Sequence, residues 1–439
     1  MMPASRQSSH FLFVLWAGGG NVPPQLNLAR RLTERGHRVS ILAPQLLRSR
    51  IEAAGGVFLP LHEVPEHDSA SLMDDLAKDW EARSPMSAAT RFRDGLIFGT
   101  ALAYSKDVTA AIEEVHPDVV APDYLLLGAY VAAERAGIPI AALVHTIYPL
   151  PAPGMPPYGM GFQPARGVVG YARDAIFSQV FSHFYNARLG ILNEVRAASG
   201  LRPLTSVFEQ FAHADRLLIL SSQTFDFPAT ALPANVRYIG PQLEDANWVA
   251  PWQSPTAGND HRPLVLVSLS TTYQRQEEVT RRIVAALATL PVRGLVTLGP
   301  ALNKDNFTFP PNVSAETYIP HILVCPQVDL VVTHAGLGTV TTALNFGKPL
   351  VCIPMGRDQG DNAARVVYRG AGIQCASTAS VNDLRSAIQR ALNEPRFREG
   401  AQRIADGMAR EGGPAVGVAE MERLAMAPSP TTRGVATSH

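Results

Sequence analysis

The chain has 439 residues, of which 46% are hydrophobic and 17% are charged, and its 38 basic residues balance 38 acidic ones. This length exceeds what one hydrophobic core usually serves, so we expect two domains of roughly 200 residues each. The balanced charge argues against nucleic-acid binding, and no apolar run approaches the ~20 residues of a membrane span.

The cysteine pattern and the chain ends indicate a cytoplasmic protein. Cys325, Cys352 and Cys375 match no zinc motif and are odd in number, which favours buried thiols in a reducing compartment. The N-terminal residues precede only the short apolar stretch FLFVLW, without a small-residue cleavage pattern. The tail, 427–439, is rich in Pro, Ser and Thr and is predicted to be disordered.

Short β-rich runs alternate with helical patterns along the first half of the chain, as in parallel sheets built from βαβ units. Leu28 and Leu32 lie on one face of an expected helix at 25–36, which Gly36 ends. The segment 150–170 is dense in Pro and Gly and is expected to be a long functional loop. Strands are expected at 11–17, 38–44, 118–123, 138–145, 216–222 and 236–241.

The pattern dissolves at 241–263, which we interpret as an interdomain linker, and then restarts. We therefore expect an α/β fold of two doubly wound halves, 1–240 and 264–426, with ligands between them beyond the carboxyl ends of the strands. A C-terminal helix, either 398–412 or the segment after it, is expected to return to the first half. Strands are expected at 263–270, 293–299, 313–319, 329–334 and 349–355, and helices at 277–290 and from about 337.

Several common motifs are missing. No G-x-G-x-x-G follows the first strand and no G-x-x-x-x-G-K-[ST] occurs, which disfavours dinucleotide binding and P-loop hydrolysis. No G-x-S-x-G nucleophile elbow occurs either, which disfavours an α/β-hydrolase.

The stretch THAGLGTVTTALNFGKPLVCIPMGRDQGDNA, 333–363, carries the most information. It is expected to run from a strand ending at His334 through a glycine-rich turn into a helix. Gly336 and Gly338 let the backbone approach a ligand, and the helix N-terminus offers free N–H groups and a positive dipole end. Such a turn is suited to a diphosphate, although glycines here also serve a tight turn without any ligand.

The full pattern resembles the nucleotide-sugar signature of the family 1 glycosyltransferases, the GT-B enzymes that include plant secondary-product and bacterial macrolide glycosyltransferases. The resemblance spans nearly the whole chain, and it implies two Rossmann-like domains that face a cleft. The positions at the family spacing are His334, Gly336, Thr339, Gly347, Pro349, Pro354, Asp358, Gln359 and Asn362.

The resemblance implies a donor-binding role for each matching residue. Tyr318 would stack on the nucleotide base, and the backbone of Ile319 would pair with the base edge. Asp358 and Gln359 would hydrogen-bond the sugar hydroxyls. The residues that would approach the diphosphate are His334, Gly336, Gly338 and Thr339 on one side, and Ser270 and Thr271 on the other.

One departure from the family leaves the donor open. The family usually has Glu eight residues after the His, on the ribose hydroxyls, whereas this chain has Thr342. A hydroxyl makes a weaker contact than a carboxylate, and Thr here is expected of relatives that use dTDP-deoxysugars. The Asp358–Gln359 pair instead favours a fully hydroxylated hexose, so the co-substrate is a UDP- or dTDP-sugar, with no cofactor.

The second departure lies in GGGNVPP, 18–24, where the family usually reads G-H-x-x-P and its His is the general base. That position is Asn21 here, and a carboxamide cannot accept a proton near neutral pH. Asp123 stands where the family has the Asp that orients the base, so we expect Asp123 to take the proton, directly or through a water. His145, after the strand at 138–145, is an alternative base, and an acidic acceptor would need little base catalysis.

These observations predict an inverting glycosyltransferase that moves a hexose or deoxyhexose to a small apolar or aromatic acceptor. The chain contains no D-x-D motif, so no catalytic metal is expected. A non-catalytic GT-B homologue that activates a partner enzyme, and a nucleotide-sugar epimerase, are the alternatives. We expect a monomer or homodimer without integral membrane association.

Overall fold

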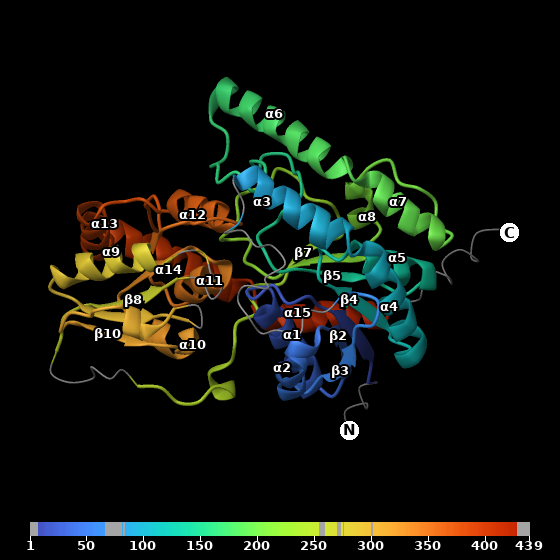
Figure 1. Ribbon diagram of the computed structural model, residues 1–439, viewed down its shortest axis with the longest axis horizontal. Coiled ribbons are helices and arrows are strands. Elements are labelled where there is room, and N and C mark those ends of the chain that lie inside the picture. The colour runs from blue at the N-terminus through green and yellow to red at the C-terminus, as the bar shows by residue number, and fades with distance from the viewer. Residues whose placement is uncertain are drawn as a thin grey trace.

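The computed structural model describes residues 8–65, 81, 84–253, 260–269, 274, 276–299 and 302–427. Its strands form parallel sheets in two halves of the molecule, with helices packed against their faces (Figure 1). The described part of the chain therefore has the α/β architecture that the alternating sequence pattern predicts. No helix in this part is long and apolar enough to cross a membrane.

The N-terminal half is built on one parallel sheet. Four strands have the order β3–β2–β1–β4, and the bridges Val120↔Ile140 and Asp123↔Leu143 join β4 to the ladder β5–β6–β7. The strands are β1 (His10–Val14), β2 (Arg38–Ala43), β3 (Val57–Pro60), β4 (Val119–Pro122), β5 (Ala141–Val144), β6 (Arg216–Ile219) and β7 (Val236–Tyr238). The α-helices are α1 (Val22–Glu34), α2 (Arg48–Ala53), α3 (Pro85–Phe92), α4 (Ala101–Val115), α5 (Leu127–Ala136), α6 (Gly167–Asn186), α7 (Leu189–Ala198) and α8 (Val207–Ala212).

Strand β1 lies in the core of the N-terminal half. All five of its residues are buried, as expected for a parallel strand that is covered on both faces. Because side chains alternate along a strand, Phe11 and Phe13 enter the core on one face, and Leu12 and Val14 enter the core on the other.

The C-terminal half is built on a second parallel sheet, with strand order β10–β9–β8–β11–β12–β13. Its strands are β8 (Leu264–Ser268), β9 (Arg293–Thr297), β10 (Val313–Glu316), β11 (Leu330–Thr333), β12 (Leu350–Cys352) and β13 (Gly372–Gln374). Its α-helices are α9 (Glu277–Ala288), α10 (His321–Val324), α11 (Leu337–Asn345), α12 (Gln359–Tyr368), α13 (Val381–Asn393) and α14 (Pro395–Arg410). The strand order reverses between β8 and β11, and sheets of this type bind their ligands beyond the carboxyl ends of the strands at such a point.

The last described helix, α15 (Pro414–Ala425), leaves the C-terminal half and packs against α1 (Figure 1). Its buried side chains Val418, Met421 and Leu424 belong to the same core as β1. The segment after 398–412 is thus the one that returns to the first half.

The two connections between the halves touch at a pair of glycines. Gly240, which precedes the linker, and Gly413, which precedes α15, both have positive φ, at 71° and 54°. A Cβ on Gly240 would lie 3.0 Å from the Cα of Gly413. Both positions therefore favour glycine for the backbone conformation, and Gly240 also needs it for the close crossing.

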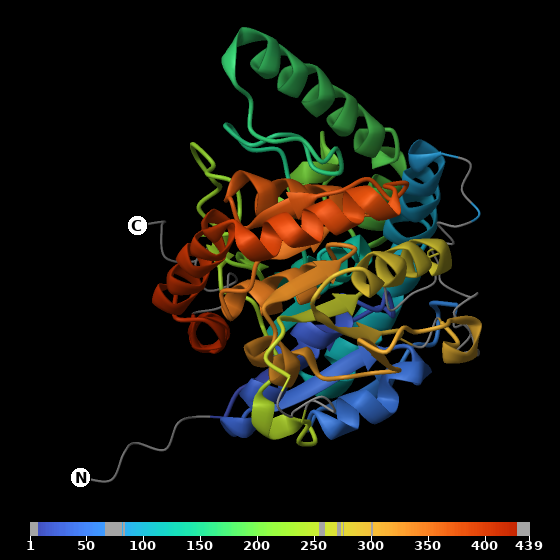
Figure 2. The same cartoon turned by 90° about the vertical axis from the view of Figure 1, so that its left-hand side faces the viewer.

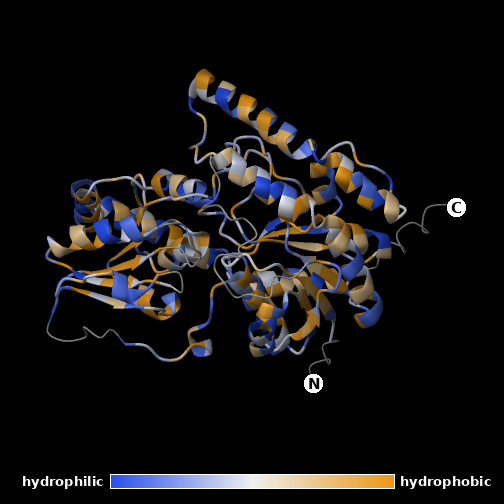
Figure 3. Ribbon diagram, viewed as in Figure 1, coloured by the Kyte–Doolittle hydropathy of each residue, from blue (hydrophilic) through white to orange (hydrophobic). Residues whose placement is uncertain are grey.

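The predicted loop at 150–170 ends earlier than expected. Residues 150–166 are irregular, but helix α6 begins at Gly167 and continues to Asn186. The helix stands at an edge of the molecule in both views (Figure 1 and Figure 2), and hydrophobic residues occur along its length (Figure 3). Val168 and Ile176 are 85% and 62% exposed. The sequence of α6 lacks the one-sided apolar stripe that identifies most surface helices, and none of its residues is fully buried.

Candidate active site

The loop at 18–24 uses Asn21 as a fixed hydrogen-bonding group. Its side-chain oxygen accepts the Gly18 amide at 3.0 Å, and Nδ2 donates to the Trp16 carbonyl at 2.9 Å. Asn21 begins α1 without capping it through its side chain. Gly18 has no room for a side chain, because a Cβ would lie 2.2 Å from the Trp16 indole. The loop thus holds its amide in one orientation.

Asp123, directly after β4, is the centre of a cluster of polar side chains. Its carboxylate is completely buried, and its Oδ2 accepts Nδ2 of Asn21 at 3.2 Å and Nε2 of Gln25 at 2.7 Å. Its Oδ1 accepts the amide of Leu125 at 3.2 Å. Sequence reasoning missed Gln25, although a polar residue one helical turn after Asn21 was a usable signal.

His145, directly after β5, completes the cluster. Its Nδ1 lies 2.9 Å from Oδ2 of Asp123, and the side chain is 12% exposed. The two atoms are close enough to interact, but Nδ1 has no partner of hydrogen-bonding geometry, so the contact is not a well-aligned hydrogen bond. The ring lies between Trp16 and Tyr124, with centroid distances of 6.5 and 5.2 Å.

The surroundings of Asp123 keep it ionised. Burial by itself would raise the pKa of the carboxyl group, but the charge and contact of His145 and the donors from Leu125 and Gln25 outweigh burial, so the pKa is lowered. A buried carboxylate that remains charged can stabilise a positive charge on the imidazole beside it.

The diphosphate side predicted from the sequence lies where β11 meets α11. Gly336 is the N-cap of α11 and no side chain caps this end, so the amides of its first turn, which includes Gly338 and Thr339, are available to a ligand. The ring of His334 lies over Gly336, where a Cβ would come within 2.5 Å of Nε2. Ser270 and Thr271 lie outside the described residues.

His334 is a neutral hydrogen-bonding group at pH 7. Burial lowers its pKa to about 4, with the charges of Arg357 and His321 acting in the same direction and a backbone hydrogen bond to Ser268 acting against them. Arg357, which sequence reasoning missed, has a left-handed backbone with φ of 53°. It places a cation within electrostatic reach of the phosphate turn.

The sugar-binding pair begins helix α12. Asp358 is the N-cap, but it does not cap the helix with its side chain; instead its Oδ2 accepts Nδ2 of Asn362 at 3.0 Å. Gln359 is buried, and its Oε1 accepts the amides of Met355 and Gly356 at 2.7 and 3.2 Å. Gln359 therefore also fixes the turn before the helix, and only Asp358 is partly open to solvent.

The predicted nucleotide-base side is open. Tyr318 is 71% exposed while its neighbour Ile319 is 2% exposed, so a large ring is available for stacking next to a buried anchor. Thr342 donates its hydroxyl proton to the carbonyl of Gly338 at 2.7 Å, which leaves it able only to accept a hydrogen bond from a ribose.

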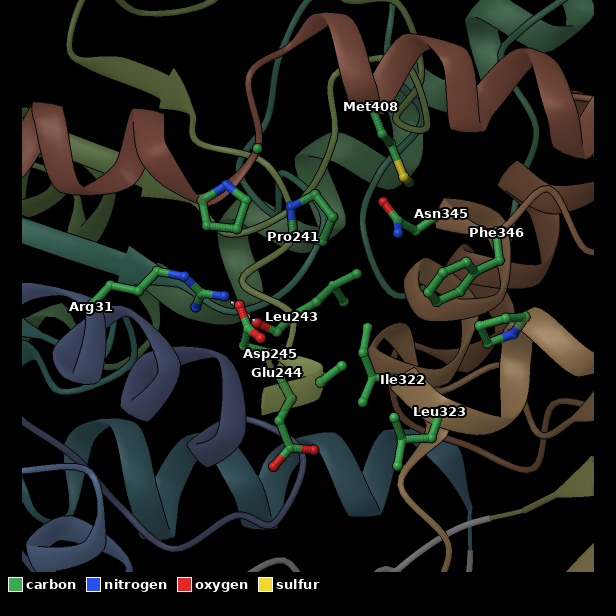
Figure 4. Close-up of a pocket in the computed structure, with 14 residues that line it drawn as sticks. Arg31, Pro241, Leu243, Glu244, Asp245, Ile322, Leu323, Asn345, Phe346 and Met408 are labelled. Atoms are coloured by element: carbon green, nitrogen blue, oxygen red, sulfur yellow. Dashed lines mark hydrogen bonds between the residues drawn. The ribbon is translucent and has the colours of Figure 1, made fainter. Parts of the chain in front are cut away.

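A separate cavity of about 470 Å³ lies at the interdomain linker (Figure 4). Arg31 points into the linker there, with its Nη2 donating to the carbonyl of Leu243 at 2.7 Å. None of the site residues predicted from the sequence lines the cavity. Its walls include Arg31, Pro241, Leu243, Glu244, Asp245, Ile322, Leu323, Asn345, Phe346 and Met408.

Comparison with known proteins agrees with this arrangement. A family model described as Erythromycin biosynthesis protein CIII-like, C-terminal domain, matches residues 281–424. The chain is 30% identical over 399 residues to the 4'-demethylrebeccamycin synthase of Lentzea aerocolonigenes, a match that covers 89% of this chain and 93% of that protein.

Solved structures share the fold. CalG4, the calicheamicin glycosyltransferase, is similar with a TM-score of 0.75 at 22% identity, over 96% of this chain and 100% of that chain. The glycosyltransferase VinC in complex with dTDP is similar with a TM-score of 0.63 at 21% identity, over 95% of this chain and 99% of that chain. The predicted arrangement of two Rossmann-like halves is confirmed by these similarities.

Proposed function

Because the chain belongs to the natural-product glycosyltransferases of the GT-B fold, we propose that it moves a hexose or deoxyhexose from a nucleotide diphosphate sugar to a small apolar acceptor. The sugar would lie at Asp358, the diphosphate at the first turn of α11, and the acceptor beside His145. The observation that carries the proposal is the contact between His145 and the buried carboxylate of Asp123.

In this proposal, His145 is the general base and Asp123 orients it. The sequence favours Asp123 as the base, but its complete burial and its contacts with Asn21 and Gln25 argue against direct contact with an acceptor. Because Nδ1 of His145 faces Asp123, Nε2 is the nitrogen that can face a substrate. Asn21 then holds Asp123 in place, and the basic group comes from β5 instead of from the loop at 18–24.

The proposed reaction is a direct displacement with inversion. Nε2 of His145 takes the proton of the acceptor hydroxyl, whose oxygen forms a bond to the anomeric carbon as the bond to the diphosphate oxygen breaks. The diphosphate leaves with the electron pair, and Asp123 stabilises the imidazolium. The free amides of α11, neutral His334 and the nearby charge of Arg357 support the leaving group without a metal.

The donor nucleotide is proposed to be dTDP or UDP. Thr342 replaces an acidic ribose ligand and can only accept a hydrogen bond, which weakens the selection for a ribose. The VinC structure contains dTDP, which makes dTDP-sugars the first donors to test. The buried free thiols of Cys325 and Cys352 support a cytoplasmic location, as a monomer or homodimer.

Acceptor-dependent release of the nucleotide tests the proposal. Purified protein is incubated with a panel of dTDP- and UDP-sugars, with and without hydrophobic alcohols and phenols, and the free nucleotide diphosphate is quantified. Release that requires an acceptor, together with an inverted anomeric centre in the product by NMR, is expected. Binding of nucleotide without any transfer across the panel would instead favour a non-catalytic partner protein.

A further inference from the structure

Helix α12 carries a second acidic group, which faces the N-terminal half. Asp361 lies one turn into the helix that Asp358 begins, and it is only 2% exposed. Its Oδ2 accepts the amide of Gly159 at 2.8 Å and its Oδ1 accepts the amide of Gly161 at 3.1 Å. One carboxylate therefore binds two amides of the irregular segment 150–166, about 200 residues away in the chain.

The segment can meet the helix this closely because it is built from glycines at the contact. Gly159 and Gly161 have φ of 87° and 64°, which side chains rarely adopt. The backbone of Gly161 also lies against Gly360, since a Cβ there would be 3.4 Å from the Gly360 carbonyl carbon. The contact thus joins the loop backbone directly to the first turn of the donor-binding helix.

This contact fixes the position of Tyr158. Its ring packs against the core of the C-terminal half, although the residue belongs to the N-terminal half. Burial raises the pKa of its phenol well above the ordinary value, and the nearby Tyr124, Asp358 and Asp361 act in the same direction. Tyr158 is therefore within electrostatic reach of Asp358 of the donor side and of Tyr124, the ring that contacts His145.

A buried ion pair ties the same helix to the segment after His145. Nε of Arg365 donates to Oδ1 of Asp226 at 2.7 Å, and both side chains are at most 3% exposed. The Oδ2 of Asp226 accepts the amide of Tyr148 at 2.9 Å. The helix is thus held on one side by this pair, and the carboxylate of Asp361 holds the loop. Nη1 of Arg365 also donates to the carbonyl of Asp361 at 3.0 Å, so the two contacts adjoin each other.

We propose that Asp361 is a positioning residue that fastens the loop 150–166 to the donor-binding helix, so that Tyr158 closes the cleft between the sugar and the acceptor. The inference rests on the proposed function. With the loop fastened, Tyr158 excludes water from the anomeric carbon and presents a wall to the acceptor. Without Asp361, the amides of Gly159 and Gly161 would lose their charged acceptor, which favours release of the loop.

Hydrogen exchange tests the fastening without reference to activity. Peptides covering 155–166 are compared in wild type, Asp361→Ala and Asp361→Asn at one pH. Because charged hydrogen bonds are lost, exchange in these peptides is expected to rise by about ten- to a hundred-fold in the Ala variant. A smaller rise is expected in Asp361→Asn, which keeps one acceptor oxygen. Asp215→Asn is the matched control. Asp215 also accepts a backbone amide, that of Ile140 at 3.0 Å, but it lies at the amino ends of β5 and β6.

The partition between transfer and hydrolysis tests the consequence. Asp361→Ala and Tyr158→Ala are both expected to raise hydrolysis of the nucleotide sugar relative to transfer by about ten-fold, and to raise the acceptor KM, while nucleotide affinity stays within two-fold. Unchanged exchange in 155–166 for Asp361→Ala would overturn the fastening. Increased exchange with an unchanged partition ratio in both variants would overturn the role of the loop. Absence of any transfer by wild type would instead refute the proposed function and leave the exchange result to stand by itself.

Discussion

Replacing His145 by Gln preserves much of the side-chain volume and the capacity for hydrogen bonding, and it removes the basic nitrogen. General-base catalysis contributes about 10²- to 10⁴-fold, so transfer to an alkyl alcohol is expected to slow by that factor, or by roughly 3–5 kcal/mol. The contact with Asp123 places the effect toward the upper part of this range. At 2.9 Å and an effective dielectric constant of about 20, the gross attraction between the carboxylate and an imidazolium is on the order of 6 kcal/mol.

The assay is the single-turnover rate of transfer to two acceptors, an alkyl alcohol and an acidic phenol, as a function of pH. An acceptor that ionises by itself needs no base, so His145→Gln is expected to lose far less with the phenol. Asp123→Asn is expected to follow the same pattern, with a loss of at least about a hundred-fold on the alcohol. His213→Gln is the control, because His213 forms a similar pair with Glu134, at 3.0 Å, near the amino end of β6. Wild-type rates with both acceptors for His145→Gln would refute the assignment.

Three further substitutions test separate parts of the structure. Gly336→Ala would place a Cβ 2.5 Å from Nε2 of His334 and so displace the imidazole ring. Calorimetry is therefore expected to find dTDP binding weakened by at least about ten-fold. Unchanged affinity would show that the His334 ring does not contact the diphosphate. Arg365→Met leaves Asp226 buried without its partner, and denaturant unfolding is expected to find about 3–5 kcal/mol less stability, a loss that a structurally unimportant pair would not produce. Burial raises the pKa of Asp361 from 3.8 to about 6, so its contribution to stability is complete below about pH 4 and is lost as the pH rises through about 6. The free energy of unfolding of Asp361→Asn minus that of wild type should therefore increase by up to about 3 kcal/mol as the pH rises between these limits. A difference that stays constant with pH would contradict the raised pKa.

Most of the strands could be predicted from the sequence because parallel strands are continuous apolar runs between turns. The expected helix at 25–36 begins earlier, at Val22, because Pro23 and Pro24 occupy its first turn, where proline is tolerated. With this start, Asn21 and Gln25 lie one helical turn apart at the beginning of α1, and both side chains donate to Asp123. The expected helix at 25–36 contained Gln25 but did not place it beside Asn21.

The candidate site could be predicted only in part. Asp123 and His145 each follow a strand, so the topology places both at the carboxyl ends of the strands. Our choice between them as the base depends on their burial, which no sequence motif reveals. The contacts of Asp361 with Gly159 and Gly161 depend on how the two halves meet. No local pattern joins residues so far apart in the chain, and helix α6 gave no apolar periodicity to follow.

A crystal structure with dTDP and an unreactive acceptor analogue would test the central claim most directly. The measured quantity is the distance from the acceptor oxygen, or its replacement, to the imidazole of His145. We predict about 2.6–3.2 Å to Nε2, with the diphosphate at the first turn of α11. An acceptor oxygen in contact with Asn21 or Asp123, and beyond hydrogen-bonding distance of His145, would contradict the account.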